Sequence, residues 1–240
     1  MTISFKDKVV IVTGSGGGLG RSHALQFAER GAKLVINDLG GAVDGSGGSS
    51  EAADKVVQEI KDMGGEAISN GSSVTDKEGV QKLVDDTMSA FGRIDVLVNN
   101  AGTNIPEPFE KVKQQSMNYL VDVNLKAAFN VAQLVVKKML KNKKRPGSII
   151  NMSSQLGHVG MIGRNVYNMT KFGIEGLTKG MGVELAKKNI RVNSVAPTFV
   201  ETPMVKRFFK NNKFKKLVLG KIPMGKVATE SDIATTVCFL

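Results

Sequence analysis

The sequence predicts an α/β fold: a single domain, residues 1–240, built on a doubly wound parallel sheet with helices on both faces. Short β-branched apolar runs alternate along the chain with longer stretches of helical periodicity. The alternation continues without a linker, an internal repeat or a second domain. Strand and helix in regular succession are typical of a parallel sheet, and short right-handed connections make the doubly wound topology the most economical one.

Six apolar runs are expected to be the strands, and the stretches between them the helices. The strands lie at residues 9–12, 34–36, 67–68, 94–98, 148–152 and 190–195. Helical patterns end at Gly31 and at Gly64-Gly65, a third covers 80–88, and two long ones cover about 113–142 and 166–188. The Gly/Ser-rich stretch 40–50 is too polar and flexible to pack, which predicts a surface loop.

Composition limits where the protein works. No apolar run approaches the roughly 20 residues that span a bilayer, and residues 1–8 lack the apolar block of a secretory signal. The single cysteine, Cys238, excludes an internal disulfide and agrees with a reducing compartment, so we expect a cytoplasmic protein. His23 and His158 each lack a second candidate ligand nearby, which predicts no metal site.

The formal net charge of +11 and the pI of about 9.7 raise the question of an anionic partner. Aromatic residues make up only 5% of the chain, with no Trp, so stacking platforms for nucleic acid are scarce. Much of the excess charge lies in two runs, 137–145 and 206–216, which we interpret as solvated lysine-rich surface. We therefore expect no nucleic acid and no membrane as a partner.

A glycine-rich turn follows the first strand and opens the next helix, at Thr13-Gly14-Ser15-Gly16-Gly17-Gly18-Leu19-Gly20. Glycines let the backbone approach a pyrophosphate, and the helix N-terminus offers unpaired N–H groups and a positive dipole end. Asp38 closes the second strand, where a carboxylate accepts hydrogen bonds from both adenosine ribose hydroxyls. The same carboxylate repels a 2′-phosphate, so the sequence predicts a Rossmann-type site that prefers NAD to NADP.

Side chains suited to proton transfer gather near the same sheet edge. Tyr167 and Lys171 are four residues apart on a predicted helix and therefore share a face. An ammonium held near a phenol favours the phenolate and lowers its pKa toward the range of a useful base. Ser153-Ser154 follows the fifth strand and Asn99-Asn100-Ala101-Gly102 the fourth, so both lie where parallel strands open onto a ligand crevice. Asn124 lies early in the first long helical stretch.

With these motifs the chain resembles the short-chain dehydrogenases/reductases. The glycine turn, the segment 99–102 and the segment 167–171 match the family's Thr-Gly-x-x-x-Gly-x-Gly, Asn-Asn-Ala-Gly and Tyr-x-x-x-Lys patterns. The family serine stands thirteen positions before the tyrosine, which selects Ser154 over Ser153, and the family's helix asparagine corresponds to Asn124. The likeness runs from about residue 6 to the end.

The resemblance implies an NAD-dependent oxidoreductase that moves a hydride between nicotinamide and a secondary alcohol or ketone. Tyr167 would exchange the hydroxyl proton, while Lys171 binds the nicotinamide ribose and lowers the pKa of Tyr167. Ser154 would orient the reacting oxygen, and Asn124 would help to hold a water relay. Cofactor contacts are implied for Gly14, Ser15, Gly18, Leu19, Gly20, Asp38, Ser73, Val74, Asn100, Ala101, Gly102, Tyr167, Lys171, Pro197, Val200 and Thr202.

Three features depart from the family pattern. Ser73 stands where many relatives have an aspartate that contacts adenine, so weaker adenine binding is expected. Pro197-Thr198 replaces the usual Pro-Gly near the nicotinamide, which stiffens that turn. The family usually continues to a further sheet strand, which is expected to be absent from this chain.

The substrate is left open by two conflicting hints. The segment 37–41 resembles (3R)-hydroxyacyl-CoA dehydrogenases, whereas the C-terminal half resembles sugar and polyol dehydrogenases and 3-oxoacyl-carrier-protein reductases. A 3-hydroxyacyl or 3-oxoacyl thioester is the first hypothesis, and a sugar or polyol is the second. A nucleotide-binding regulator without turnover is the alternative of another class, although the chain keeps the serine, the tyrosine and the lysine.

The second long helix also bears on assembly. Gly173, Gly176, Gly180 and Gly182 stand among apolar residues there, and glycines inside a helix cost roughly 1 kcal/mol each relative to Ala. A close contact with the sheet or with another backbone would compensate. By the family resemblance this helix and the preceding long one form a dimer contact, so we expect a homodimer or a homotetramer.

Overall fold

The computed structural model describes residues 3–40, 51–141, 145–202, 205–206 and 209–240. Its centre is one six-stranded parallel sheet with the strand order β3-β2-β1-β4-β5-β6. The strands are β1 (Val9–Thr13), β2 (Lys33–Asn37), β3 (Glu66–Asn70), β4 (Val96–Asn99), β5 (Gly147–Met152) and β6 (Ile190–Val195). Every residue of β1, β4 and β5 is buried, as expected for a parallel sheet that is covered on both faces.

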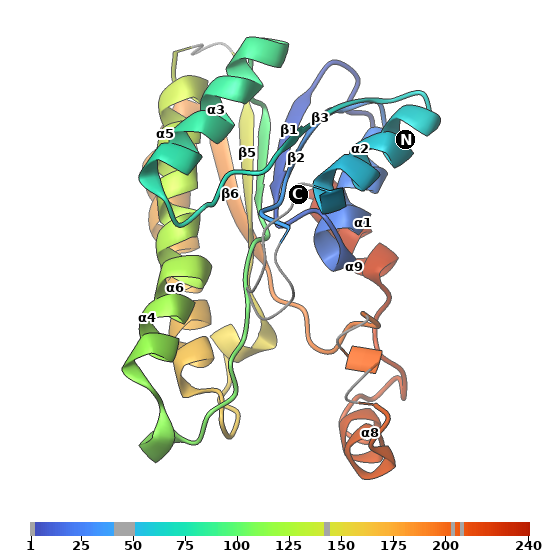
Figure 1. Cartoon of the computed structure of the whole chain (residues 1–240), viewed down its shortest axis with the longest axis vertical. Helices are drawn as coiled ribbons and strands as arrows, with labels where there is room; N and C mark the ends of the chain where they lie inside the picture. Colours follow the sequence, from blue (N-terminus) through green and yellow to red (C-terminus); the bar gives the residue numbers. More distant parts are fainter. Residues whose placement is uncertain (1–2, 41–50, 142–144, 203–204, 207–208) are drawn as a thin grey trace.

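Helices cover both faces of this sheet (Figure 1). The α-helices are α1 (Gly18–Ala28), α2 (Glu51–Asp62), α3 (Lys77–Phe91), α4 (Gln114–Val121), α5 (Ala127–Met139), α6 (Asn165–Leu185), α8 (Asn212–Leu219) and α9 (Glu230–Phe239). Short 3-10 turns are η1 (Phe109–Lys111), η3 (Gln155–Gly157) and η4 (Ala186–Lys188). In Figure 1, α1, α2 and α9 lie on one side of the sheet, α3, α5 and α6 lie on the other, and α8 stands apart at the lower right.

The hydrophobic core has one half on each face of the sheet. Val10 and Val12 pack against residues of α1, α2 and α9, whereas Ile11 between them packs against residues of α3 and α5. This alternation follows from the two-residue period of a strand. Phe27 of α1 is the largest fully buried side chain. The core therefore fixes the helices on both sides of β1, which is the strand that leads into the glycine turn.

The strand order reverses next to β1. The chain moves outward through β1, β2 and β3, and then returns to place β4 on the other side of β1. The connections after β1 and β4 consequently run in opposite directions and leave a crevice at the carboxyl ends of these strands. Ligands of open α/β sheets bind in this position.

The α/β fold and its doubly wound parallel sheet are confirmed, and two details differ from the expectation. The fourth strand begins at Val96 rather than at residue 94, since its ladder with β1 starts at the pair of Val10 and Val96. The helix expected over 113–142 is interrupted by a π-helical turn, η2 (Asp122–Lys126), between α4 and α5.

Two further expectations concern segments at the margins. The loop predicted at 40–50 lies outside the described residues except for Gly40. Of the two basic runs, the described parts lie at the end of α5 and around α8, where Lys138 pairs with Asp85 and Lys206 with Glu201. Within the described ranges, no helix combines the length and the apolar character that crossing a membrane requires.

Candidate active site

The glycine turn between β1 and α1 is held in place by the segment that follows β4. The Asn100 side chain donates to the carbonyl oxygens of Thr13 at 3.0 Å and of Gly14 at 2.8 Å. The Thr13 hydroxyl accepts the N–H groups of Asn100 and Ala101, both at 3.1 Å. A Cβ at Gly20 would overlap the Gly14 carbonyl oxygen, so only glycine allows the turn to close this tightly. The two sequence motifs therefore form one structural unit.

The open side of this turn has the properties of a dinucleotide site. α1 begins at Gly18 without a side-chain cap on its N-terminus and without an acid in its first turn. A Cβ at Gly17 or Gly18 would meet no atom of the described chain within 4 Å. Unpaired N–H groups and a positive dipole end in such an open position suit a pyrophosphate. The residues present therefore fit a nicotinamide dinucleotide.

Two side chains of the turn point into the protein. Ser15 is fully buried; its N–H donates to the Asn37 carbonyl at 3.0 Å and its hydroxyl donates to the Val12 carbonyl at 2.7 Å. Leu19 packs against the hydrophobic cluster beneath α1. Both side chains consequently shape the turn from inside.

Asp38 follows β2 and contacts the glycine turn directly. Its Oδ2 accepts the Gly16 N–H at 2.7 Å, and its Oδ1 accepts the Gly40 N–H at 2.8 Å. Each carboxylate oxygen accepts more than one hydrogen bond, so both keep capacity for ribose hydroxyls. Arg21, the basic residue just beyond the turn, is held in an ion pair by Glu59. The charge at the end of β2, beside the glycine turn, is therefore negative.

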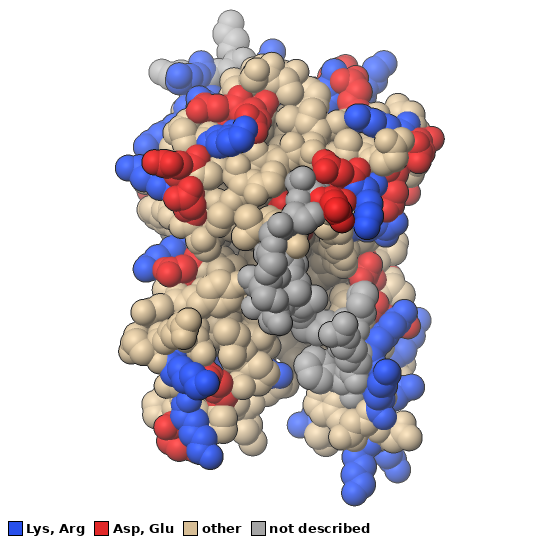
Figure 2. Space-filling view, viewed as in Figure 1, with Lys and Arg blue, Asp and Glu red and all other residues tan. Residues whose placement is uncertain are grey.

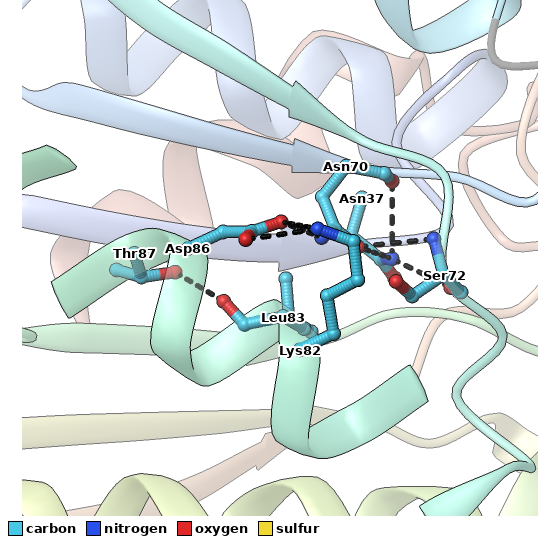
Figure 3. Close-up of polar contacts among 7 residues, drawn as sticks. All are labelled: Asn37, Asn70, Ser72, Lys82, Leu83, Asp86 and Thr87. Atoms are coloured by element: carbon cyan, nitrogen blue, oxygen red, sulfur yellow. Dashed lines mark hydrogen bonds and ion pairs between the residues drawn. The ribbon is translucent and has the colours of Figure 1, made fainter. Parts of the chain in front are cut away.

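The strand end that carries Asp38 is anchored to β3 and α3 by a series of polar contacts (Figure 3). Asn37 donates to the Asn70 side-chain oxygen at 3.0 Å and to the Ser72 carbonyl at 2.9 Å. Asn70 in turn donates to Asp86 at 2.7 Å, and Asp86 pairs with Lys82 at 2.9 Å. These contacts hold the segment after β3 beside the segment after β2.

Ser73 and Val74 follow this anchored stretch. The Ser73 hydroxyl lies 2.8 Å from the Thr75 hydroxyl and accepts the Thr75 N–H at 3.2 Å, so part of its hydrogen-bonding capacity is already used. Val74 lines a small cavity together with Thr13 and Ala101. Both residues therefore stand at the edge of the crevice, next to the two motifs that form the turn.

Tyr167 and Lys171 lie on the first two turns of α6, beside the end of β5. The Ser154 hydroxyl forms a hydrogen bond with Tyr167, and the Lys171 Nζ lies 5.5 Å from the centre of the Tyr167 ring. Lys171 is buried and donates to the Met152 carbonyl at 2.8 Å. Ser153 is buried, and its hydroxyl has no hydrogen-bond partner within the described chain. Of the two serines, Ser154 is the one that meets the tyrosine.

Asn124 is buried at the π-helical turn η2, close to Lys171. Its side-chain oxygen accepts the Thr103 N–H at 2.8 Å, and its amide donates to the Thr103 carbonyl at 2.9 Å and to the Thr170 hydroxyl at 3.3 Å. A Cβ at Gly102 would lie 3.2 Å from the Asn124 oxygen and 3.8 Å from the Lys171 Nζ. Asn124 and Lys171 thus converge next to Gly102. Single π-helical turns within helices occur frequently at functional sites.

Burial governs the ionisation of the tyrosine and the lysine. It raises the pKa of Tyr167, and the Ser154 hydrogen bond and the Arg164 charge oppose this rise. It also lowers the pKa of Lys171 to about 8, against the attraction of Glu175. In this structure burial outweighs the Ser154 hydrogen bond and the Arg164 charge, both of which favour the phenolate. The lowering of the Tyr167 pKa by the Lys171 charge stays a prediction.

The segment expected near the nicotinamide lies against the Ser154 loop. The Gln155 N–H donates to the Pro197 carbonyl at 2.9 Å. Val200 is buried and pairs with Ala228 in an isolated parallel bridge, and the Thr202 hydroxyl accepts the Val205 N–H at 3.3 Å. Residues 197–202 consequently pass over the carboxyl end of the sheet on the side of β5 and β6.

Three contributions to this site were not predicted from the sequence. The Met152 carbonyl holds Lys171, and a backbone atom leaves no signal in a motif. The Arg164 charge acts on Tyr167 from three positions earlier, and the Glu175 charge acts on Lys171 from four positions later. Both residues stand three or four positions from Tyr167 or Lys171 on the same helix or at its N-cap, and this spacing is the sequence signal for them, because residues three and four apart are neighbours on a helix.

A dinucleotide turn and a serine, tyrosine and lysine group at the same sheet edge are the parts of an oxidoreductase site. Residues 8–213 match the family model of the short chain dehydrogenases, and the chain belongs to this family of oxidoreductases, which bind a nicotinamide cofactor. It is 37% identical over 233 residues to a 3-oxoacyl-[acyl-carrier-protein] reductase of Thermotoga maritima, a match that covers 97% of this chain and 89% of that protein.

Other relatives extend the comparison. A 3-oxoacyl-[acyl-carrier-protein] reductase of Staphylococcus aureus is 39% identical over 233 residues, covering 97% of this chain and 90% of that protein. The peroxisomal hydratase-dehydrogenase-epimerase of Saccharomyces cerevisiae is 45% identical over 195 residues, covering 81% of this chain but only 21% of that protein. The solved structure of a 7α-hydroxysteroid dehydrogenase with NADH and 7-oxo glycochenodeoxycholic acid has a TM-score of 0.91 at 30% identity, covering 99% of this chain and 88% of that one.

Proposed function

We propose that this enzyme is an NAD-dependent dehydrogenase/reductase whose substrate is a 3-hydroxyacyl or 3-oxoacyl thioester. The observation that carries the proposal is the contact between Ser154 and Tyr167 beside the buried Lys171, at the carboxyl edge of the sheet that also holds the glycine turn. Nicotinamide, when bound, supplies or accepts the hydride. The side chains supply placement and proton transfer.

The proposed roles follow from the contacts. In the reduction of a ketone, the Tyr167 hydroxyl donates its proton to the carbonyl oxygen that becomes the alcohol. Burial raises the pKa of Tyr167, so the phenol carries this proton at neutral pH. Ser154 donates a hydrogen bond to the same oxygen, and Lys171 holds the cofactor ribose. Asn124, fixed by Thr103 and Thr170, helps to conduct a proton from solvent to Tyr167.

Two observations support a thioester substrate. The relatives named above include 3-oxoacyl-[acyl-carrier-protein] reductases that match 97% of this chain. Lys213, Lys215 and Lys216 gather on α8, and Figure 2 shows the lower right of the molecule, where α8 lies, as predominantly basic. Phosphate groups of a carrier arm would be attracted there. A sugar or polyol is the second candidate, since the C-terminal half also resembles enzymes of that class.

The experiment that tests this proposal is a substrate panel with the purified protein. NADH production would be followed with 3-hydroxyacyl thioesters, sugars, polyols and simple secondary alcohols, and NADH consumption with the corresponding ketones. We expect the highest kcat/KM with a 3-oxoacyl or 3-hydroxyacyl thioester. A higher value with a sugar or polyol would select the second candidate. If the protein bound the nicotinamide cofactor but converted no compound of the panel, the alternative of a nucleotide-binding regulator would be favoured instead.

Cofactor choice is expected to depend on Asp38. The wild-type enzyme should have a higher kcat/KM with NAD than with NADP, because the carboxylate accepts ribose hydroxyls and repels a 2′-phosphate. Asp38→Ser should narrow this preference by about tenfold or more, as expected for losing roughly 1.4 kcal/mol of discrimination. Asp54→Ser on the exposed side of α2 removes the same charge and should leave the ratio unchanged. Equal or better kcat/KM of the wild type with NADP would refute the assignment.

Assembly into at least a dimer is proposed through α5 and α6. Met169, Phe172 and Val183 on α6 are exposed by 50%, 50% and 83%, and Gly176 and Gly180 between them face open space. The spacing of these five positions makes one continuous stripe along the helix. An exposed apolar stripe of this kind marks an interaction surface.

Sedimentation equilibrium at micromolar concentration would test this assembly. We expect a mass of at least twice the 25.7 kDa of one chain. Phe172→Lys should lower that mass by placing a charge in the contact, whereas Leu217→Lys on α8 should not. A stable wild-type mass near 25.7 kDa would show that the stripe is exposed in the working enzyme.

A further inference from the structure

Glu175 is a buried carboxylate one helical turn beyond Lys171. Its residue is only 7% exposed, and one carboxylate oxygen, Oε2, accepts the Ser194 hydroxyl of β6 at 2.9 Å. The other oxygen, Oε1, lies 3.4 Å from the His158 Nε2 and forms no hydrogen bond within the described chain. A buried carboxylate with so few donors is unfavourable unless an opposite charge is close.

The loop that carries Ser154 packs directly onto Glu175 and Lys171. A Cβ at Gly157, at the end of η3, would lie 2.8 Å from the Ser153 hydroxyl, 3.0 Å from the Lys171 carbonyl and 3.1 Å from the Glu175 Cγ. These distances leave no room for a side chain at position 157. The carboxylate therefore lies beneath the Ser154 loop rather than on the surface of α6.

Lys171, one helical turn before Glu175, carries the opposite charge and is buried as well. Lys171 is 6% exposed, and its ammonium donates a hydrogen bond to the Met152 carbonyl. Residues four apart share a helix face, so Lys171 and Glu175 lie on the same side of α6. Burial lowers the pKa of Lys171 to about 8, and the charge of Glu175 raises it against that effect. Each charge therefore reduces the unfavourable burial of the other.

Other charged or titratable groups near this pair lie on α6, where the exposed Lys179 stands four residues after Glu175, and at the turn η3. On α6 and at its N-terminus, Tyr167 lies beside Lys171, and Arg164 acts on Tyr167. From the turn η3 and the residue after it, His158 faces Glu175. Ser194 and Asn124, which approach from β6 and η2, are uncharged. Glu175 is consequently the acid that acts on the Lys171 ammonium.

We propose that Glu175 is a positioning residue that keeps the Lys171 ammonium charged inside the active site and so widens the pH range in which the enzyme binds its cofactor and turns over. The inference rests on the proposed function, because it gives Lys171 the role of holding the nicotinamide ribose. An ammonium makes stronger, charge-assisted hydrogen bonds to a ribose hydroxyl than a neutral amine does. Loss of its proton should therefore weaken NADH binding and turnover together.

Replacing the carboxylate by an amide isolates this effect. In Glu175→Gln, burial of Lys171 is no longer opposed, so its pKa falls below about 8 and the proton is lost closer to neutral pH. We expect the alkaline limb of the kcat/KM profile to move to a pH about 1 lower, which is the scale of one nearby charge. NADH binding, followed by its fluorescence, should weaken over the same interval. Glu175→Asp, which keeps the charge, should restore most of the wild-type range.

Ser194→Ala is the matched control, because it removes a hydrogen bond to Glu175 but leaves the carboxylate in place. Its alkaline limb should lie at nearly the same pH as that of the wild type. Glu175→Met, which keeps the length of the side chain without a charge, replaces the amide variant if that variant does not fold. The proposal would be overturned if the alkaline limb of the uncharged variant lay at the same pH as that of the wild type, both for kcat/KM and for NADH binding. NADH binding needs no turnover, so this result is independent of whether the thioester assignment is correct.

Discussion

Replacing Tyr167 by Phe is expected to lower kcat by about 100-fold or more, the scale of general acid–base catalysis, while NADH still binds. The change removes the hydroxyl that exchanges a proton with the substrate oxygen and that bonds to Ser154. It removes little volume, so α6 and the buried Lys171 beside the ring should keep their places. Steady-state turnover and NADH fluorescence titration, measured on the same preparation, separate the two effects.

Tyr119→Phe is the matched control for this variant, because the chain has two tyrosines and Tyr119 lies on α4. Its turnover should stay within about twofold of the wild type, as is usual for a change that leaves the reacting groups in place. Retention of most activity in Tyr167→Phe would show that another group carries the proton. Loss of NADH binding in step with turnover would instead show that the tyrosine acts through the cofactor.

The parts of the site that the sequence predicts are those in which one motif stands on one predicted element. The glycine turn follows a strand and opens a helix, and Asn100 follows the neighbouring strand; the structure joins them through the Thr13 hydroxyl. Tyr167 and Lys171 need only a helix to share a face. In each case the spacing along the chain already determines which groups meet, because parallel strands end at the same edge of the sheet.

The parts that the sequence does not predict depend on contacts between distant elements. Glu175 meets Ser194 of β6 and His158 after η3, and nothing in the local pattern of α6 indicates either partner. The π-helical turn at Asn124 interrupts a stretch that the sequence predicts as one continuous helix. The raised pKa of Tyr167 follows from its burial, which the Tyr-x-x-x-Lys spacing does not contain.

Acid should destabilise this protein through one buried histidine. His23 lies on the buried stripe of α1, is 0% exposed, and neither ring nitrogen has a hydrogen-bond partner within the described chain. Burial lowers its pKa from 6.5 to about 4. Below pH 6.5 His23 is protonated in the unfolded chain, whereas in the folded chain it is protonated only below about pH 4. The free energy of unfolding therefore falls across this interval. The total loss is on the order of 3 kcal/mol, since a tenfold difference in proton affinity between the two states corresponds to about 1.4 kcal/mol.

His23→Leu removes this titration and keeps an apolar side chain of similar size on the stripe. Urea unfolding at pH 7 and pH 4.5 should show that the variant loses about 2–3 kcal/mol less stability than the wild type between these two values. Carboxylates that titrate in the same interval affect both proteins equally, so the difference isolates His23. His158→Leu is the matched control: its imidazole is 54% exposed and reaches water without any opening of the fold, so the wild-type loss should remain. An equal loss in His23→Leu and in the wild type would mean that the buried imidazole accepts its proton in the folded state.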